Sequence, residues 1–458
     1  MSAFVSGLVQ QLQDVPSQNN DFPFYDLRDP SDRGLIVSRC TPQSFHLGTG
    51  ASLFTNLLIP AITSAASEII LVTCFWAPSK TLAALSDALA KLAAHRCRLV
   101  VEARSTGNSP PEPLRVRICF SSRSLLQKLL HPQSRHGYLY PPDAFSRDLG
   151  LPDARLLEAA SIELRVKTLF FLPFSVMHPK FIIVDRNRVF VPSCNVSWEP
   201  WLEGCLELTG DAVTGLMSFY TRTWDPELDI QTPLSSQPSS APPFRFQDAS
   251  LVEVSSSAYR RLALPASGAP LPTFILPSSH HRNPQFRFPW QRAAAVPRTP
   301  LNVALIHLFQ GAHHSIFVQT PNLTCKPVID AMLGAISTGV SVTIVTNRRM
   351  MVLEQLATAG TTMDWCVRSL VRRFRQLQRN SVAHDVELGS RNLGSLCVST
   401  FHPRKRMKSG AREAQPLTAS FPEEEPVHSH LKLAVVDSEL TMLGSGNMDR
   451  AVSCSPVF

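Results

Sequence analysis

Hydrophobic and polar residues follow the same order in the two halves of the chain. The segments Leu58–Ala77 and Leu305–Asn322 each have the spacing of a helix followed by a nearly continuous apolar strand. Each is succeeded by a second helix and a second apolar strand, over Leu82–Ala103 and Val328–Asn347. Helices that alternate with short apolar strands are typical of α/β folds with buried sheets. Because the order occurs twice, we expect two α/β lobes related by a pseudo-twofold, each a mixed sheet flanked by helices.

A stretch of different composition separates the two halves. Residues 231–300 contain twelve prolines and many serines, and neither the helical nor the strand period continues there. Such a composition is typical of a linker with irregular parts. We therefore expect a first lobe over residues 1–230, a linker over 231–300 and a second lobe over 301–458.

Charge and cysteine content narrow the class of protein. The 458 residues have a formal net charge of +8, which suits an anionic partner such as a phospholipid surface, a nucleic acid or a phosphate ester. The ten cysteines include no C-x-x-C pair, so reduced thiols and a cytoplasmic location are expected. No uninterrupted apolar stretch reaches the length of a membrane span, so any contact with a membrane is expected to be peripheral.

Each half ends on a pair of predicted strands, and the second strand of each pair begins with a histidine. The motif H-x-K-x4-D occurs twice, at His178, Lys180 and Asp185 and at His430, Lys432 and Asp437. With this composition a chance match is expected on the order of 0.01 times. A short polar cluster follows each motif after the same gap, at Pro192–Asn195 and Gly444–Asn447. A single histidine at a strand start is usually a surface residue, but two matched motifs at equivalent repeat positions indicate a functional site.

The residue types in these motifs suit a phosphodiester. Alternate side chains of a strand share a face, so each motif histidine is expected to point the same way as its lysine. Two histidines, two lysines and the two asparagines Asn195 and Asn447 form a cationic, donor-rich pocket. A neutral imidazole can attack phosphorus, and a protonated imidazole can donate to the leaving oxygen. This chemistry needs no metal or other cofactor.

This constellation resembles the phospholipase D superfamily, which is defined by two His-Lys-Asp motifs. The resemblance extends over residues 40–225 and 300–449, and its pattern is most similar to a fungal branch of phospholipase D-like proteins related to bacterial-type cardiolipin synthases. The segments that support it are Phe45–Gly50, Thr73–Ser79, Phe174–Asp185, Pro192–Trp198 and Gly444–Arg450.

The resemblance implies a role for each motif residue. One of His178 and His430 is the nucleophile and the other is the general acid, an assignment that the sequence leaves open. The phosphate-binding residues would be Lys180, Lys432, Asn195 and Asn447, with support from Ser193 and Ser445. The motif aspartates, Asp185 and Asp437, would be structural. In many members a carboxylate beyond the asparagine orients a catalytic histidine, and Glu203 occupies that place.

Two positions depart from the family pattern. Pro192 replaces the glycine expected before Ser193, which removes one backbone donor. After Asn447 eleven residues follow, and they contain no glutamate. By comparison with the first lobe, we expect the second lobe to lack one strand and one helix, His430 to lack an orienting carboxylate, and the chain to be damaged or inactive.

The resemblance implies a phosphodiesterase or phosphatidyltransferase acting on phospholipids through a phosphohistidine. A nuclease of the same superfamily is the alternative within enzymes, and a catalytically inactive lipid- or phosphate-binding relative is the alternative outside them. The arginines at 372, 373, 375 and 379 predict a basic helix face. That face would meet lipid headgroups or nucleic acid, or would simply be solvated.

Overall fold

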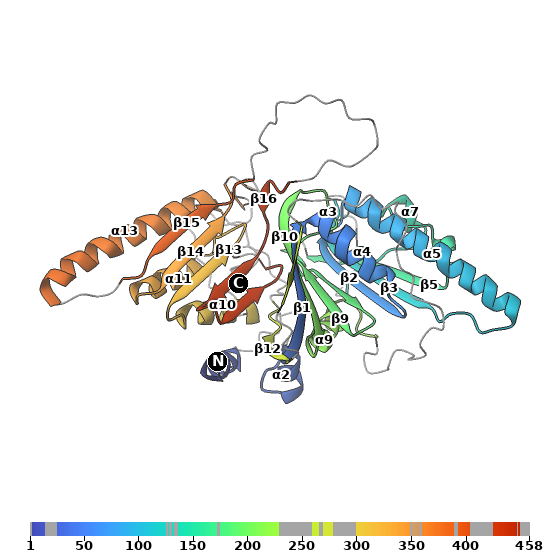
Figure 1. Ribbon diagram of the computed structural model, residues 1–458, viewed down its shortest axis with the longest axis horizontal. Coiled ribbons are helices and arrows are strands. Elements are labelled where there is room, and N and C mark those ends of the chain that lie inside the picture. The colour runs from blue at the N-terminus through green and yellow to red at the C-terminus, as the bar shows by residue number, and fades with distance from the viewer. Residues whose placement is uncertain are drawn as a thin grey trace, which may run out of the picture.

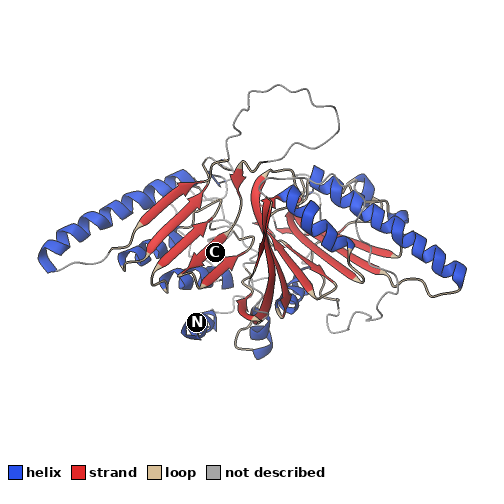
Figure 2. Cartoon of the chain, in the orientation of Figure 1, coloured by secondary structure: helices blue, strands red, loops and turns tan. Residues whose placement is uncertain are grey.

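The computed structural model consists of two α/β lobes that lie side by side (Figure 1). Strands form the inside of each lobe and helices flank them (Figure 2). The structure describes residues 2–13, 25–124, 127, 131, 136–171, 175–228, 259–264, 269–277, 299–348, 350, 352, 355–356, 360–388, 393–403, 425–446 and 448.

The first sheet is mixed and has eleven strands. Along its main path the order is β11-β1-β10-β9-β8-β2-β3-β5-β4, with β12 paired to β1 and β16 paired to β10. The strands are β1 (Val37–Thr49), β2 (Glu68–Phe75), β3 (Leu114–Ser122), β4 (Tyr138–Leu139), β5 (Ile162–Thr168), β8 (Phe181–Val184), β9 (Arg188–Pro192), β10 (Trp201–Gly210), β11 (Arg260–Ala263), β12 (Leu271–Phe274) and β16 (His428–Ser429). A separate hairpin joins β6 (Phe170–Phe171) and β7 (Ser175–Val176).

The second sheet repeats the centre of the first. Its order is β15-β14-β13-β17-β18. The strands are β13 (Ser315–Gln319), β14 (Ser341–Thr346), β15 (Leu396–Thr400), β17 (Leu433–Val436) and β18 (Leu440–Leu443). Three neighbouring strands are parallel in each sheet, β2, β3 and β5 in the first and β13, β14 and β15 in the second, and the two strands that follow the motif histidine pair antiparallel beside them. The predicted fold of two repeated α/β lobes is therefore confirmed.

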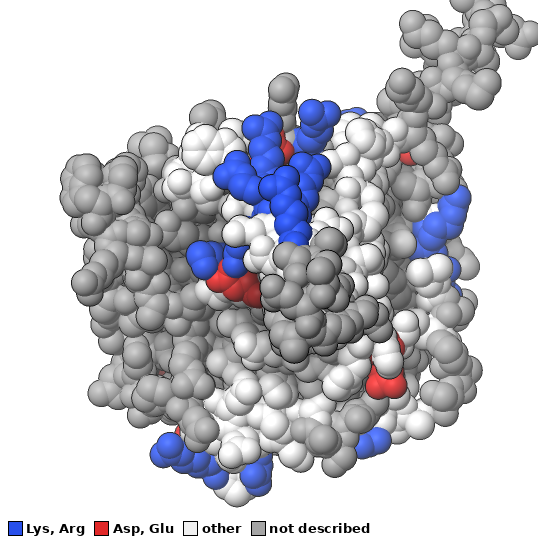
Figure 3. Space-filling view, turned by 90° about the vertical axis from the view of Figure 1, so that its left-hand side faces the viewer, with Lys and Arg blue, Asp and Glu red and all other residues white. Residues whose placement is uncertain are grey.

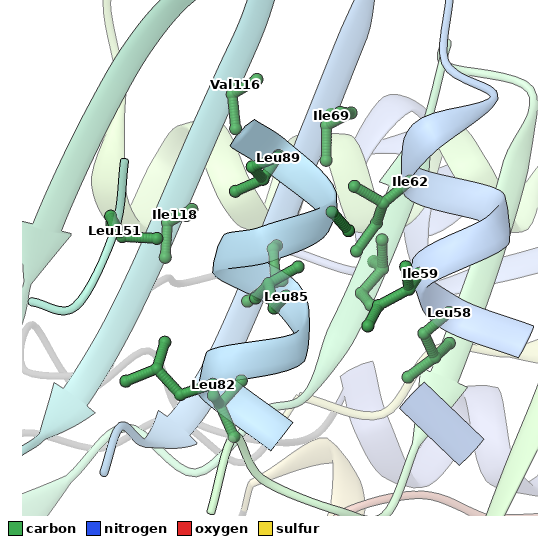
Figure 4. Packing of buried hydrophobic residues seen from close by; sticks show 14 of the residues in the cluster. Leu58, Ile59, Ile62, Ile69, Leu82, Leu85, Leu89, Val116, Ile118 and Leu151 are labelled. Carbon is green, nitrogen blue, oxygen red and sulfur yellow. The ribbon is translucent and has the colours of Figure 1, made fainter. Parts of the chain in front are cut away.

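Helices cover the sheets because the strands are apolar on one or both faces. In β2, Ile69 and Leu71 belong to one core cluster and Ile70 and Val72 to another, so both faces of this strand are buried. Figure 4 shows the first cluster, where leucines of α5 pack on β2 and β3. The helices are α1 (Ser2–Gln13), α2 (Pro30–Ile36), α3 (Gly50–Leu53), η1 (Phe54–Leu58), α4 (Ile59–Thr63), α5 (Lys80–Thr106), α7 (Ala144–Arg147), α8 (Ala154–Ala159), α9 (Ala212–Trp224), α10 (Pro300–Gln310), α11 (Lys326–Ser337) and α13 (Met363–Leu388).

The lobes exchange more structure than the sequence indicates. Strand β16, from the second half of the chain, pairs in parallel with β10 of the first sheet. At the other end of the molecule α1 packs on α10, and His307 Nε2 is 3.3 Å from the Phe4 carbonyl. Within the expected linker, β11 and β12 add to β1. Short strands that pair at an edge need backbone hydrogen bonds rather than an apolar period, so the composition did not reveal them.

The cysteines, the longest helices and the edge of the second sheet bear on three expectations from the sequence. Free thiols include Cys40, Cys119 and Cys205. Cys325 is disulfide-bonded, so the expectation of uniformly reduced cysteines is wrong there. No helix in the described part of the chain is long and apolar enough to cross a membrane. In the described part of the second sheet, β18 lies at the edge. The predicted lack of a further strand and helix concerns residues beyond those described and stays a prediction.

Candidate active site at the junction of the lobes

The first motif lies directly before β8. His178 and Lys180 precede the hydrogen-bonded ladder rather than lying within it, which differs from the expected alternation along a strand. The two side chains nevertheless meet, because Lys180 Nζ is 3.4 Å from His178 Nε2 and donates to the His178 carbonyl at 3.2 Å. Lys180 is buried and His178 is partly buried. Burial lowers the pKa of Lys180.

The second motif has the same arrangement directly before β17. Lys432 Nζ donates to His430 Nε2 at 2.7 Å and to the His430 carbonyl at 2.8 Å. Both side chains are buried. Each lobe therefore provides one buried lysine whose ammonium group contacts the motif histidine of the same lobe.

The two motifs form one site. The titratable groups that face His178 are Lys180 of its own lobe and Lys432 and His430 of the other lobe. Burial and these three groups hold the pKa of His178 well below its usual value, while a hydrogen bond to the Ser445 backbone acts in the opposite direction. His178 is consequently neutral at pH 7.

Glu203 of β10 orients His430 across the lobe boundary. The Glu203 Oε1 atom accepts a hydrogen bond from His430 Nδ1 at 2.8 Å. The expectation that His430 lacks an orienting carboxylate is therefore wrong, because the first lobe supplies it. Burial lowers the pKa of His430 to about 4, and the negative charge of Glu203 opposes that shift. Burial alone would raise the pKa of Glu203, but His430, Lys432 and a hydrogen bond from Ser193 bring it below its usual value.

The small polar residues after the first motif support the carboxylate and the strands. Ser193 Oγ donates to Glu203 Oε2 and accepts from the Gly204 amide at 2.9 Å. Its hydroxyl is thus used to hold Glu203. Asn195 Oδ1 accepts from the Phe75 amide at 3.2 Å, so its amide NH2 is the group that remains for a ligand.

The residues after the second motif are described in part. Ser445 lies beside His178, whose ring bonds to the Ser445 backbone. The predicted phosphate ligand Asn447 lies outside the described residues. Met448, which follows it, bridges to Leu323, as Val196 bridges to Trp76 in the first lobe.

The motif aspartates lie in the turns after β8 and β17, at the far end of each strand from the histidine. Asp185 accepts hydrogen bonds from the backbone amides of residues 66–68 at 2.7 to 2.9 Å. Asp437 accepts from the amides of residues 313–315, each at 2.8 Å. Both have positive φ, 48° and 54°, a conformation that aspartate tolerates in tight turns. Each carboxylate therefore attaches a turn to the start of the neighbouring strand.

Three residues near the site were missed in the sequence. Asn347, after β14, donates to the Ser429 carbonyl at 2.6 Å and accepts from its amide at 2.8 Å, which holds the segment before His430. The Trp201 ring lies 4.9 Å from the His430 ring. Glu199 contributes a negative charge at Lys180. Their positions in the sequence could have indicated them, because Glu199 and Trp201 closely follow Asn195 and Asn347 directly follows an apolar strand.

The neighbouring aromatic residues Phe75 and Trp76, at the end of β2, have different surroundings. Trp76 is fully buried, donates to the Leu149 carbonyl at 3.0 Å and stacks on Phe120, so it is a core residue. Phe75 is partly exposed and its ring contacts that of Trp198 with 5.8 Å between centroids. Phe75 and Trp198 therefore lie next to Asn195 at the edge of the site.

Comparisons with known proteins give one family match and several similar solved structures. Residues 305–453 match the family model described as the phospholipase D-like domain of cardiolipin synthase. The crystal structure of phosphatidylserine synthase from Haemophilus influenzae Rd KW20 is similar, with a TM-score of 0.47, 13% identity and coverage of 98% of this chain and 84% of that chain. Nuc from Salmonella typhimurium, described as a phospholipase D family member, has a TM-score of 0.22 and 17% identity. That match covers 40% of this chain and 95% of that chain. Comparison with curated protein sequences gives no match.

The fold and site define a two-lobed protein with one His-Lys pair from each lobe at a shared centre. Residues 305–453, which include the second His-Lys-Asp motif, match the phospholipase D-like family model, and the first lobe repeats the same motif. This match supports phosphodiester chemistry in general.

Proposed function

We propose that the chain is a phospholipase D-type phosphodiesterase or phosphatidyltransferase that acts on phospholipids through a phosphohistidine intermediate. The observation that supports this most directly is the meeting of two His-Lys pairs, with both lysines buried, at one centre. Buried like charges raise the free energy of an empty site, and a phosphodiester anion between them lowers it. Lys180, Lys432 and the Asn195 amide are the proposed phosphate ligands, and Asn447 is added from the sequence motif.

His178 is the nucleophile in this proposal. The groups that face it are cations or a neutral ring, so its imidazole stays neutral and keeps a lone pair. In the first step a ring nitrogen of His178 forms a bond to phosphorus while the bond from phosphorus to the leaving oxygen breaks. The product is a phosphatidyl group attached to His178.

His430 is the general acid and base. Glu203 stabilises positive charge on its ring, and a bound phosphodiester adds a second negative charge, so His430 is the histidine that can hold a proton. Protonated His430 donates to the leaving alkoxide. In the second step water or an alcohol gives its proton to His430 and attacks phosphorus, and the bond to His178 breaks. Water completes hydrolysis, and an alcohol completes transfer.

The deciding experiment is incubation of the full chain with mixed phospholipid vesicles in EDTA, and separately with single-stranded DNA. Release of headgroup, or formation of a new phospholipid, supports the proposal, because lysines and asparagines bind the phosphate. His178→Asn should abolish the products, whereas His95→Asn, on α5 away from the site, should keep them. Products from DNA alone identify a nuclease. Vesicle binding without any product identifies an inactive lipid-binding relative.

A further inference from the structure

Helix α13 has a stripe of exposed arginines along one side. Arg368, Arg372, Arg375 and Arg379 are all exposed and follow one another at intervals of four, three and four residues. This spacing places them on one face of a helix. Figure 3 shows basic side chains gathered over this end of the molecule. The opposite face contributes Leu370, Phe374 and Leu377 to the core of the second lobe.

The stripe is not neutralised by nearby carboxylates. Arg373, beside the stripe, forms an ion pair with Asp330 at 2.6 Å. Within the described part of the chain none of the four stripe arginines forms an ion pair. A row of unpaired guanidinium groups on a rigid helix favours a partner that presents many phosphates or carboxylates.

Exposed apolar residues occur at the start of α13 and on segments next to the motif residues. Trp365 begins the stripe and is 68% exposed, and Trp198, Leu356 and Val427 are 57%, 48% and 43% exposed. Monomeric proteins expose such residues singly, but these four come from segments that surround one site.

Hydrogen bonds attach these segments to the site. Trp198 lies three residues after Asn195, and the Val427 amide donates to the Pro200 carbonyl at 2.9 Å, three residues before His430. Leu356 follows Gln355, whose Oε1 accepts from the Met363 amide at 2.8 Å at the start of α13. The same Gln355 donates to Asn322 Oδ1 at 2.6 Å, directly after β13. Trp198 and Val427 thus lie on segments next to Asn195 and His430, and Leu356 and the start of α13 are connected to the segment after β13, the strand that pairs with β17.

We infer that these eight residues form a docking surface for an anionic phospholipid bilayer. The docking surface comprises Arg368, Arg372, Arg375 and Arg379 with Trp198, Leu356, Trp365 and Val427. Arginines bind lipid phosphates, tryptophan prefers the headgroup layer, and aliphatic side chains enter the acyl boundary. Nucleic acid would also bind the stripe but offers nothing to exposed Leu356 and Val427. The inference rests on the proposed function only in that docking would present the active site to its substrate.

Vesicle flotation tests the docking surface without any turnover. One set of vesicles contains phosphatidylcholine alone, and the other contains about one third phosphatidylglycerol. The double variant Arg372→Glu/Arg375→Glu should bind the anionic vesicles about tenfold more weakly or worse, because each basic residue adds to the attraction. The matched control, Arg28→Glu/Arg33→Glu, has the same charge change at or beside α2, which lies below the junction of the lobes and away from α13 (Figure 1), and should bind as wild type.

The apolar part is tested in the same way. Trp365→Ala should weaken binding to both kinds of vesicle, whereas Val101→Ala, an equally exposed residue on α5, should not. Unchanged urea midpoints for all variants ensure that folding is not responsible. The inference is overturned if Arg372→Glu/Arg375→Glu binds anionic vesicles as wild type does. It is also overturned if this variant loses binding to single-stranded DNA but not to vesicles.

Activity on a short-chain phospholipid below its micelle concentration separates this inference from the proposed function. There is no bilayer to dock on, so Arg372→Glu/Arg375→Glu should turn over this substrate at the wild-type rate. If neither the wild type nor any variant gives product, the proposed function fails. The flotation experiment still shows whether the docking surface binds anionic vesicles. If the arginine variant loses activity on the monomeric substrate, the stripe acts in catalysis and the docking assignment is wrong.

Discussion

Glu203 of the first lobe accepts a hydrogen bond from His430 of the second lobe, with 2.8 Å between Oε1 and Nδ1. The backbone sets this contact, because Leu202 pairs with Ser429 in the parallel ladder between β10 and β16. The His430 amide also donates to the Leu202 carbonyl at 2.8 Å. Glu203 and His430 therefore follow paired residues, and one lobe orients the motif histidine of the other.

Replacing Glu203 by glutamine should impair catalysis more than substrate binding. The amide keeps the shape but loses the charge that stabilises protonated His430, so kcat should fall roughly 10²- to 10⁴-fold, as for other general acids that lose their support. KM should change little. The measurement is steady-state kinetics of Glu203→Gln. Glu207→Gln, on the same strand but bound to Arg188, is the control and should retain most activity. A rise in KM together with a fall in kcat, in both Glu203→Gln and Glu207→Gln, would indicate damage to β10 instead.

The two histidines should respond differently to the leaving group. His178→Ala removes the proposed nucleophile and should lower turnover of every substrate by roughly three orders of magnitude or more. His430→Ala removes the proposed acid, so it should be nearly as damaging with an alkyl leaving group but much less so with p-nitrophenolate, which departs without a proton. Rates with both substrate types check this prediction. If His178→Ala, rather than His430→Ala, is the variant that regains turnover with the p-nitrophenyl substrate, the two roles are reversed.

The pH profile should depend on the charge at Glu203. The general acid must be protonated, and burial lowers the pKa of His430 to about 4, so kcat/KM should fall as pH rises through that region. A bound phosphodiester raises the pKa of His430, so the alkaline limb of kcat should lie at higher pH than that of kcat/KM. In Glu203→Gln the opposing charge is lost, the pKa of His430 falls further, and the limb moves to lower pH. Profiles of wild type and variant that coincide would contradict this assignment.

Asp437 should matter for stability rather than for chemistry. Its carboxylate accepts three backbone amides, so Asp437→Ala should lower the free energy of unfolding by about 1–3 kcal/mol, measured in urea. Asp437→Asn keeps one acceptor oxygen and tolerates positive φ, so its loss should be smaller. At conditions where each protein is folded, both should retain turnover close to wild type. A turnover loss as large as that of His178→Ala would instead place Asp437 in the chemistry.

The repeated lobes and the two motifs could be predicted because they depend on local patterns. Apolar strands such as β2 and β13 are short, nearly continuous runs, and their periodicity identifies them without knowledge of neighbours. The motif spacing is equally local. The position of Glu203 beyond Asn195 was also predictable, since the family pattern places a carboxylate there.

The junction between the lobes could not be predicted in the same way. Strand β16 has two residues, and its pairing with β10 joins segments 227 positions apart in sequence, so no period marks it. The repeat suggested that each lobe needs a carboxylate of its own for its histidine. His430 instead uses Glu203 of the other lobe, and the expected deficiency at His430 was wrong for that reason. Asn347 was missed because a polar residue after a strand is usually the start of a loop.

The pairing of β10 with β16 also limits how far the two lobes can move apart. The hydrogen bonds from His430 to Leu202 and from Val427 to Pro200 cross the same boundary as the bond between Glu203 and His430. A hinge that swung the lobes apart would break all three at once and leave His430 without its partner. We therefore expect a clamshell motion of the lobes to be unfavourable for as long as the ladder persists. Substrate entry and product release are therefore expected to take place with the two lobes held together.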